Sequence, residues 1–179
     1  MASGFSRTWI AACCDTAVPT HGPGHLRAFD YTGMYRYFLT FCCHSHAQRF
    51  ITAPVVELVL EQFLRAATHE QFAILAYCFM PDHAHMLVEA NTDSSNALCF
   101  ISRCKQLSGF HYQQRHGQRL WQRYGYEHVL RDDEDTRRVA RYILENPVRG
   151  GLIARAQDYP FLGSCVFTVD EILEGTTSG

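Results

Sequence analysis

Two histidines, His83 and His85, lie two residues apart in an apolar segment, 80–88, which begins with a Pro-Asp turn. Side chains at positions i and i+2 of a β-strand point to the same face, so a strand here would set the two imidazoles side by side, with Cα atoms roughly 7 Å apart. Both rings could then bind one small cation in front of the sheet. A histidine pair without metal is as common, so the spacing alone leaves both interpretations open.

Two further constellations could carry chemistry. His44 and His46 have the same spacing but lie in a polar stretch, which favours solvated surface over metal binding. Tyr142 and Asn146 are four residues apart in a predicted helix and would share one face. Asn146 precedes Pro147, which makes it the predicted last helical residue or cap, with an amide able to coordinate. The local alternative is a half-buried tyrosine followed by an ordinary helix terminator.

The elements that must position these side chains follow from hydrophobic periodicity. The predicted elements are strands over 35–42, 72–80 and 83–90, helices over 54–68, from a cap at 93–95 to 110 and from a cap at 132–135 to 146, and a short strand or ordered loop within 120–130. Pro81 and Asp82 predict a tight hairpin between the second and third strands. This order of elements predicts an α+β domain built on an antiparallel sheet.

The length of 179 residues is that of one domain, which we expect over 34–168, after an irregular leader (1–33) and before a tail (169–179). Eight cysteines without a C-x-x-C spacing favour free thiols in a reducing cytoplasm. The apolar residues near the N-terminus are too few for a signal peptide. No run approaches the ~18 apolar residues that a membrane span requires, so we expect a soluble protein.

Positive charge is concentrated in one part of the chain. Residues 101–156 carry 11 Lys and Arg against 6 Asp and Glu, although the net charge of the whole chain is −2. Arginine, which supplies nearly all of this charge, pairs bidentately with phosphate and stacks on bases. The segment could therefore bind nucleic acid, although such charges often only solvate helix faces.

Three separated segments, 80–85 (MPDHAH), 127–132 (EHVLRD) and 138–149 (RVARYILENPVR), carry a family resemblance. Together they resemble the REP-associated tyrosine transposases, which belong to the single-tyrosine HUH superfamily. The resemblance covers about residues 31–165, with the elements in the family's order. It implies the fold of an HUH endonuclease, a ferredoxin-like antiparallel sheet with flanking helices.

The resemblance also implies roles for particular residues. His83 and His85 would be metal ligands, Asn146 the third protein ligand and Tyr142 the nucleophile. Imidazole and amide donors with open positions suit Mg²⁺ or Mn²⁺. The substrate would be single-stranded or hairpin DNA of REP type, cleaved and transferred through a 5′-phosphotyrosine, by a monomer or a homodimer. The candidates for DNA binding are Lys105, Arg123, Arg131, Arg138, Arg141 and Arg149, with Tyr124 and Tyr126 stacking on bases or packing against the sheet.

Three other functions fit parts of the sequence. A metal-dependent nuclease that uses water would keep the histidines and dispense with Tyr142. A non-catalytic ferredoxin-like module would stack bases on an aromatic sheet and need no divalent ion. A purely structural α+β domain would simply bury its histidines with satisfied hydrogen bonds.

Overall fold

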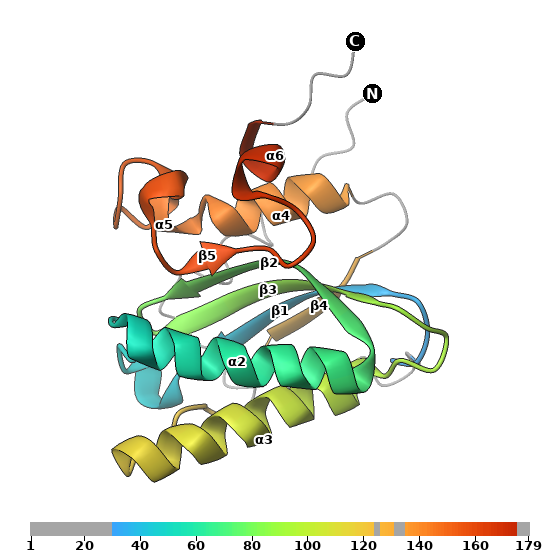
Figure 1. Cartoon of the computed structure of the whole chain (residues 1–179), viewed down its shortest axis with the longest axis horizontal. Coiled ribbons are helices and arrows are strands. Elements are labelled where there is room, and N and C mark those ends of the chain that lie inside the picture. Colours follow the sequence, from blue (N-terminus) through green and yellow to red (C-terminus); the bar gives the residue numbers. More distant parts are fainter. Residues whose placement is uncertain (1–29, 124–125, 131–134, 175–179) are drawn as a thin grey trace.

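The computed structural model describes residues 30–123, 126–130 and 135–174, which form an α+β unit (Figure 1). Its elements are β1 (Arg36–Cys42), η1 (His44–His46), α2 (Ala53–Glu70), β2 (Phe72–Met80), β3 (His83–Ala90), α3 (Ala97–His116), β4 (Tyr126–Val129), α4 (Thr136–Leu144), α5 (Asn146–Arg149), η2 (Ala156–Asp158), β5 (Leu162–Gly163) and α6 (Val169–Glu174). The four longer strands and the first two long helices agree with the predicted order.

The sheet has the strand order β4-β1-β3-β2-β5, and all its pairings are antiparallel. Its first four strands, with α2 and α3 as connections, have the ferredoxin-like arrangement. This confirms the predicted fold class. The hairpin of β2 and β3 is also confirmed, because Met80 pairs with His83 across the two-residue Pro-Asp turn. The short edge strand β5 lay outside the prediction.

One face of the sheet carries α2 and α3 over an aromatic core (Figure 1). Tyr37, Leu39 and Phe41 alternate along β1 and are each at most 1% exposed. Phe63 of α2 packs on Phe41, with ring centroids 4.9 Å apart, and on Trp121 at 5.9 Å. Burial of each such ring contributes roughly 1.5–3 kcal/mol to the stability of the fold.

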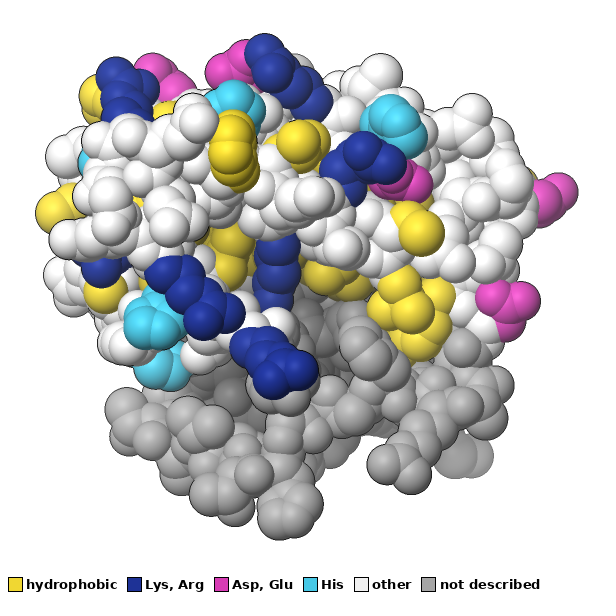
Figure 2. Space-filling model, turned by 90° about the horizontal axis from the view of Figure 1, so that it is seen from below, with side chains coloured by type: hydrophobic (Ala, Val, Ile, Leu, Met, Phe, Trp, Pro, Cys, Tyr) yellow, Lys and Arg dark blue, Asp and Glu magenta, His cyan; other side chains and the backbone are white. Residues whose placement is uncertain are grey.

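The outer surface of α2 and α3 carries mixed charge. Figure 2, which views the molecule from this side, shows Lys and Arg side chains spread among histidine, acidic and uncharged ones. A groove of about 650 Å³ between the two helices has both signs in its lining, with Glu57 and Glu61 beside Arg65 and Arg115. Such a mixture is typical of a solvated surface.

The opposite face carries α4, α5 and α6 (Figure 1). Val139, Ile143 and Leu144 of α4 are buried against this face together with Leu87 of β3. Asp135 caps α4 by accepting a hydrogen bond from the Arg137 N–H at 2.9 Å, as its predicted role required. No helix in the described ranges is both long and apolar enough to cross a lipid bilayer.

Two helix ends differ from the prediction. α3 is capped by Asn96 rather than by residues 93–95, since the Asn96 side chain accepts from the N–H groups of Leu98 and Cys99. α4 ends at Leu144, and Asn146 begins the one-turn helix α5 instead of ending α4. Pro147 fits the first turn of α5, where its missing N–H has no intrahelical partner.

The packed unit extends past the predicted limits of 34 and 168. Tyr31 is only 5% exposed and belongs to the aromatic core. At the other end, Ile172 and Leu173 of α6 are buried in the cluster under α4. Both regions have too few periodic apolar residues to be recognised from sequence as part of a domain.

Candidate active site

The two histidines of β3 form the centre of the site. His83 and His85 point to the same side of the strand, and their ring centroids are 4.6 Å apart at an interplanar angle of 75°. The Nε2 atoms of the two rings approach to 3.0 Å. The two imidazoles therefore converge, as predicted, through their Nε2 atoms.

Each imidazole is oriented through its other nitrogen. His83 Nδ1 lies 2.7 Å from Asp82 Oδ1, and His85 Nδ1 lies 3.0 Å from the Thr40 hydroxyl. A carboxylate or hydroxyl on one ring nitrogen fixes the orientation of the ring and raises the basicity of the other nitrogen. These two partners, one from the hairpin turn and one from β1, therefore aim the Nε2 atoms at a common point.

The charges around the pair favour a neutral His85 and an ionised Asp82. Burial lowers the pKa of His85 well below its usual value, and the charges of His83 and Arg149 act in the same direction. The hydrogen bond from His83 lowers the pKa of Asp82, although burial opposes this shift. A neutral imidazole beside a carboxylate-bound one is the state in which histidines bind metals.

The geometry of the pair fits a hard divalent ion. Two donors in adjacent positions of an octahedral ion, each about 2.1 Å from it, are separated by about 3 Å. The Nε2 atoms of His83 and His85 have this separation. Among the described residues, no cluster of three or more His, Cys, Asp or Glu side chains is placed to hold a metal. The remaining donors would therefore be amide, water or substrate oxygens.

Asn146 is held in a fixed orientation at the start of α5. It is 6% exposed, and its Nδ2 donates to the carbonyl oxygens of Tyr142 and Ile143 at 3.4 and 3.3 Å. These two bonds use the amide nitrogen and leave the amide oxygen out of the contacts with α4. α5 reaches the imidazole end of the hairpin, because a Cβ at Gly150 would lie 3.0 Å from the side chain of Met80, the strand partner of His83.

Tyr142 and His85 contact the same aromatic ring. Phe38 of β1 stacks on His85 with centroids 5.4 Å apart, and its ring meets Tyr142 edge-on at 6.4 Å. The Arg149 guanidinium lies 3.8 Å from the centroid of the Tyr142 ring and donates to the Tyr142 carbonyl oxygen. The phenol thus lies on the same face of the sheet as the imidazole pair, between Phe38 and a cation.

The predicted DNA-binding residues other than Lys105 fall into three groups. Arg138, Arg141 and Arg149 lie on the face of the sheet that holds the imidazole pair, and all three are exposed. Arg123 is exposed just before β4. The third group, Tyr124, Arg131 and the side chain of Tyr126, lies outside the described residues.

Lys105 is the predicted DNA-binding residue that the structure places elsewhere. It lies on α3, across the sheet from the imidazole pair (Figure 1). Its ammonium donates to the carbonyl oxygens of Gln122 and Arg123, at 3.3 Å in both cases. These bonds tie α3 to the chain that leads into β4, which is a structural role.

Sequence reasoning missed the residues that orient the site. Phe38 and Thr40 are two residues apart on β1 and therefore point to the same face of the sheet. Their contact with the site follows only from the pairing of Thr40 with His85 across β1 and β3. His46, predicted as solvated surface, lies in η1 with its Nδ1 3.7 Å from Asp82 Oδ2. Ser45 and His46 both have positive φ, 57° and 51°, which few non-glycine residues adopt. The Asp82 carboxylate therefore lies between two imidazoles.

Comparison with known proteins gives consistent matches. The family model of IS200-like transposases matches residues 32–146. A candidate REP-associated tyrosine transposase of Haemophilus influenzae is 26% identical over 144 residues, which cover 74% of this chain and 81% of the relative. A REP-associated tyrosine transposase of Escherichia coli is 24% identical over 128 residues, covering 70% and 73%.

A solved structure has the same fold. It is that of a REP-associated tyrosine transposase bound to a REP hairpin, with a TM-score of 0.64 and 21% identity. The superposition covers 77% of this chain and 81% of the other. At this identity the match supports the architecture of the sheet and helices.

Proposed function

We propose that this chain, which belongs to the family of IS200-like transposases, cleaves and rejoins single-stranded DNA at REP-type hairpins through a tyrosine nucleophile. The observation that carries the proposal is the pair of Nε2 atoms 3.0 Å apart, on the face of the sheet where Phe38 contacts both His85 and Tyr142. The names of the relatives, and the hairpin bound by the structural neighbour, indicate the substrate class.

The metal site of the proposal consists of His83, His85 and Asn146. Two imidazole nitrogens and one amide oxygen leave open positions for oxygen donors, which suits Mg²⁺ or Mn²⁺. Bound there, the ion would draw charge from a non-bridging oxygen of the scissile phosphate and make its phosphorus more electrophilic. Asp82 and Thr40 keep the imidazoles aimed at it.

Tyr142 is the proposed nucleophile. A tyrosine phenol ordinarily has a pKa of about 10, so the nucleophile must lose its proton to solvent or to a base during attack. The phenol oxygen bonds to phosphorus, the bond from phosphorus to the 3′ oxygen breaks, and that oxygen leaves as a 3′-OH after gaining a proton. The DNA remains joined through a 5′-phosphotyrosine. Because the new linkage is again a phosphodiester, a 3′-OH can reverse the step without ATP.

The arginines around α4 supply the proposed contacts to the DNA backbone. Arg138, Arg141 and Arg149 lie within two turns of Tyr142 or follow it on α5, and Arg123 precedes β4. Each phosphate contact with a single strand lowers the slope of log affinity against log salt by about 0.7. A DNA substrate and free thiols, such as those of Cys43 and Cys78, favour the cytoplasm as its location.

One experiment tests the reaction directly. The protein is incubated with labelled single-stranded REP hairpins, with and without Mn²⁺, and denatured complexes are separated on a gel. We expect a covalent complex that requires Mn²⁺ and disappears in Tyr142→Phe, while Tyr35→Phe, a matched change at a residue 40% exposed, retains it. An adduct that persists in Tyr142→Phe contradicts the proposed nucleophile. Cleavage without any adduct would instead favour a nuclease that uses water.

A further inference from the structure

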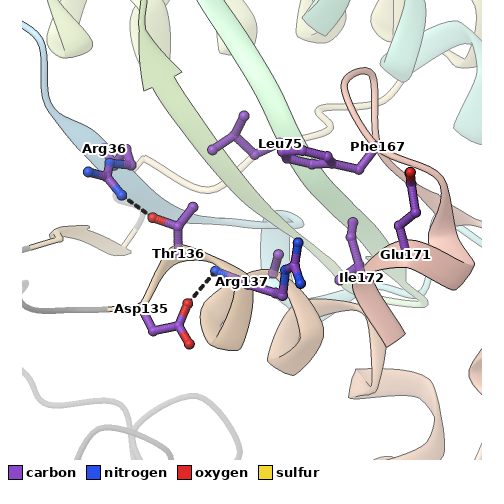
Figure 3. A pocket seen from close by; sticks show the side chains of 9 residues that line it. Arg36, Leu75, Asp135, Thr136, Arg137, Phe167, Glu171 and Ile172 are labelled. Atoms are coloured by element: carbon purple, nitrogen blue, oxygen red, sulfur yellow. Dashed lines mark hydrogen bonds between the residues drawn. The ribbon is translucent and has the colours of Figure 1, made fainter. Parts of the chain in front are cut away.

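A cavity of about 370 Å³, shown in Figure 3, lies at the start of α4, the helix that carries the proposed nucleophile. Its walls come from the sheet through Arg36 and Leu75, from the start of α4 through Thr136 and Arg137, and from the C-terminal region through Phe167 and Glu171. The cavity thus joins three parts of the chain that are distant in sequence, and the roles proposed above leave it unused.

Phe167 is presented to the cavity by a well-ordered turn. The Ser164 hydroxyl accepts hydrogen bonds from the N–H groups of Val166 and Phe167, both at 3.0 Å. Thr168 and Glu171 then form a reciprocal capping box at the start of α6, with bonds of 2.7 and 3.2 Å. Although Phe167 is 45% exposed, its backbone is therefore fixed on both sides. An exposed aromatic ring on a rigid turn is preorganised for stacking.

The lining suits a flat ligand. In Figure 3 the Phe167 ring lies next to Leu75 on one side of the cavity, and Arg137 extends toward the same space from α4 on the other. A planar group between them would stack on the phenyl ring and could contact the guanidinium. Bases of single-stranded DNA are bound in this way by aromatic and arginine side chains.

The charges of the lining select against a simple anion. Two guanidinium groups, Arg36 and Arg137, are balanced by two carboxylates, Asp135 and Glu171. Arg36 is also engaged with the Thr136 hydroxyl and with Glu89, 3.4 Å away. A neutral ligand with donors and acceptors on its edge matches this set better than a phosphate does. Donor and acceptor groups on a flat neutral ring are the features of a nucleobase.

We infer that this cavity binds one unpaired nucleobase of the DNA, stacked on Phe167, and so contributes to the choice of the cleavage position. The inference rests on the proposed function, because the cavity and the proposed nucleophile share α4. They also share β1, where Arg36 lines the cavity and Phe38 contacts Tyr142, roughly 7 Å along the strand. A base in the cavity therefore belongs to a nucleotide near the scissile phosphate.

The test is an abasic scan of a REP hairpin that has unpaired flanks on both sides. Binding is measured in EDTA, so that cleavage plays no part, with an abasic residue at each unpaired position in turn. Stacking of a base on an aromatic side chain is worth about 1–3 kcal/mol, so one position should weaken binding by about 5- to 150-fold. Phe167→Ala should weaken binding of the intact hairpin to a similar extent and be indifferent to the abasic change at that position.

Two further variants sharpen the result. Phe167→Tyr keeps the ring and should retain the sensitivity to the abasic position. Val166→Ala, at a neighbouring residue that is 51% exposed and does not line the cavity, should bind like the wild type. The inference is overturned if, at every position, the loss of affinity caused by the abasic residue adds to the loss caused by Phe167→Ala. It is also overturned if Phe167→Ala binds the hairpin normally. Failure of the wild type to bind the hairpin at all would instead contradict the proposed function.

Discussion

The two faces of the sheet differ in what they bury, although the same strands supply both. On the α2 and α3 side, β1 contributes Tyr37, Leu39 and Phe41 to an aromatic core. On the α4 side, the alternate residues Phe38 and Thr40 contact the imidazole pair instead. Because successive side chains of a strand point to opposite faces, β1 contributes to an apolar core on one face and to a polar site on the other.

Buried polar side chains occur both in the proposed active site and elsewhere in the fold. Those found among the described residues are Thr40, Gln62, His85, Ser95, Ser108 and Asn146. Three of them, Thr40, His85 and Asn146, belong to the proposed active site. Burying a polar group costs free energy unless it is hydrogen-bonded, so a face that holds such groups needs a rigid support. The aromatic face supplies that support. Changes on the imidazole face should therefore mainly reduce activity, and changes on the aromatic face should mainly reduce stability.

The largest effect is expected on activity, from the imidazole face. His83→Ala or His85→Ala should reduce formation of the covalent complex by at least about 10³-fold, since metal-assisted charge stabilisation is worth several kcal/mol. Hairpin binding should change far less, because phosphate contacts supply most of the affinity. His69→Ala, at a side chain 63% exposed on α2, is the control. Equal losses of complex formation in all three variants would contradict the expected difference between the two faces.

The largest effect on stability is expected from the aromatic face. Phe63→Ala removes a fully buried ring and should cost about 3–5 kcal/mol in urea unfolding. At a temperature where the variant is folded, its rate of complex formation should stay close to that of the wild type. Leu64→Ala, on the same helix but 39% exposed, should lose under about 1 kcal/mol. A folded Phe63→Ala protein without activity would show that the two faces are not separable.

An intermediate effect is expected from the residue that orients His83. Asp82→Asn keeps the shape of the side chain but removes its charge, and should weaken Mn²⁺ binding by about 10–100-fold. The change would be measured as the Mn²⁺ concentration needed for half-maximal complex formation. Asp93→Asn, an exposed change before α3, should leave that concentration unaltered. An unchanged Mn²⁺ requirement in Asp82→Asn would remove Asp82 from the site.

The smallest effect concerns the ion pair that links the two helices of the aromatic face. Partial burial raises the pKa of Glu70, but the hydrogen bonds from Arg103 and His69 outweigh it and lower the pKa overall. A carboxyl with a lowered pKa in the folded state stabilises the fold above its unfolded pKa, and this stability is lost as the pH falls through the folded value. Arg103→Gln should therefore cost at most about 1 kcal/mol at pH 7.

That cost should be smaller at a pH well below the ordinary pKa of a glutamate, 4.5, than at pH 7, which thermal unfolding at the two pH values would reveal. Arg65→Gln breaks the ion pair with Glu61, in which the Arg65 side chain is 60% exposed. Its stability cost should differ less between the two pH values. A loss of stability in Arg103→Gln that is the same at both pH values would mean that the pairing with Glu70 is not its cause.

Much of the fold could be predicted because its elements carry strong local patterns. β2 and β3 are continuous apolar runs around a Pro-Asp turn, and their predicted limits coincide with those observed. β5 has only two residues, Leu162 and Gly163, and owes its strand structure to pairing with β2. α5 is similarly short, with four residues after Glu145. Such elements depend on tertiary contacts that no short sequence window contains.

For the proposed site, the convergence of the two imidazoles could be predicted from sequence, but the atoms that converge could not. The spacing of His83 and His85 indicated convergence, yet which nitrogens converge depends on Asp82 next door and on Thr40, 45 residues away from His85 in sequence. Tyr142 was predicted as the nucleophile from the resemblance of residues 138–149 to the family, because its helical distance from Asn146 alone left an ordinary half-buried tyrosine as the alternative. Its edge contact with Phe38 required the packing of α4 on β2 and β3, which follows from the whole fold.

The bonds from Asn146 to the last turn of α4 have a mechanical consequence. The Asn146 amide nitrogen donates to the carbonyl oxygens of Tyr142 and Ile143. The proposed third ligand and the backbone of the proposed nucleophile are therefore held together. A cation bound by Asn146 would therefore be coupled to the backbone position of Tyr142.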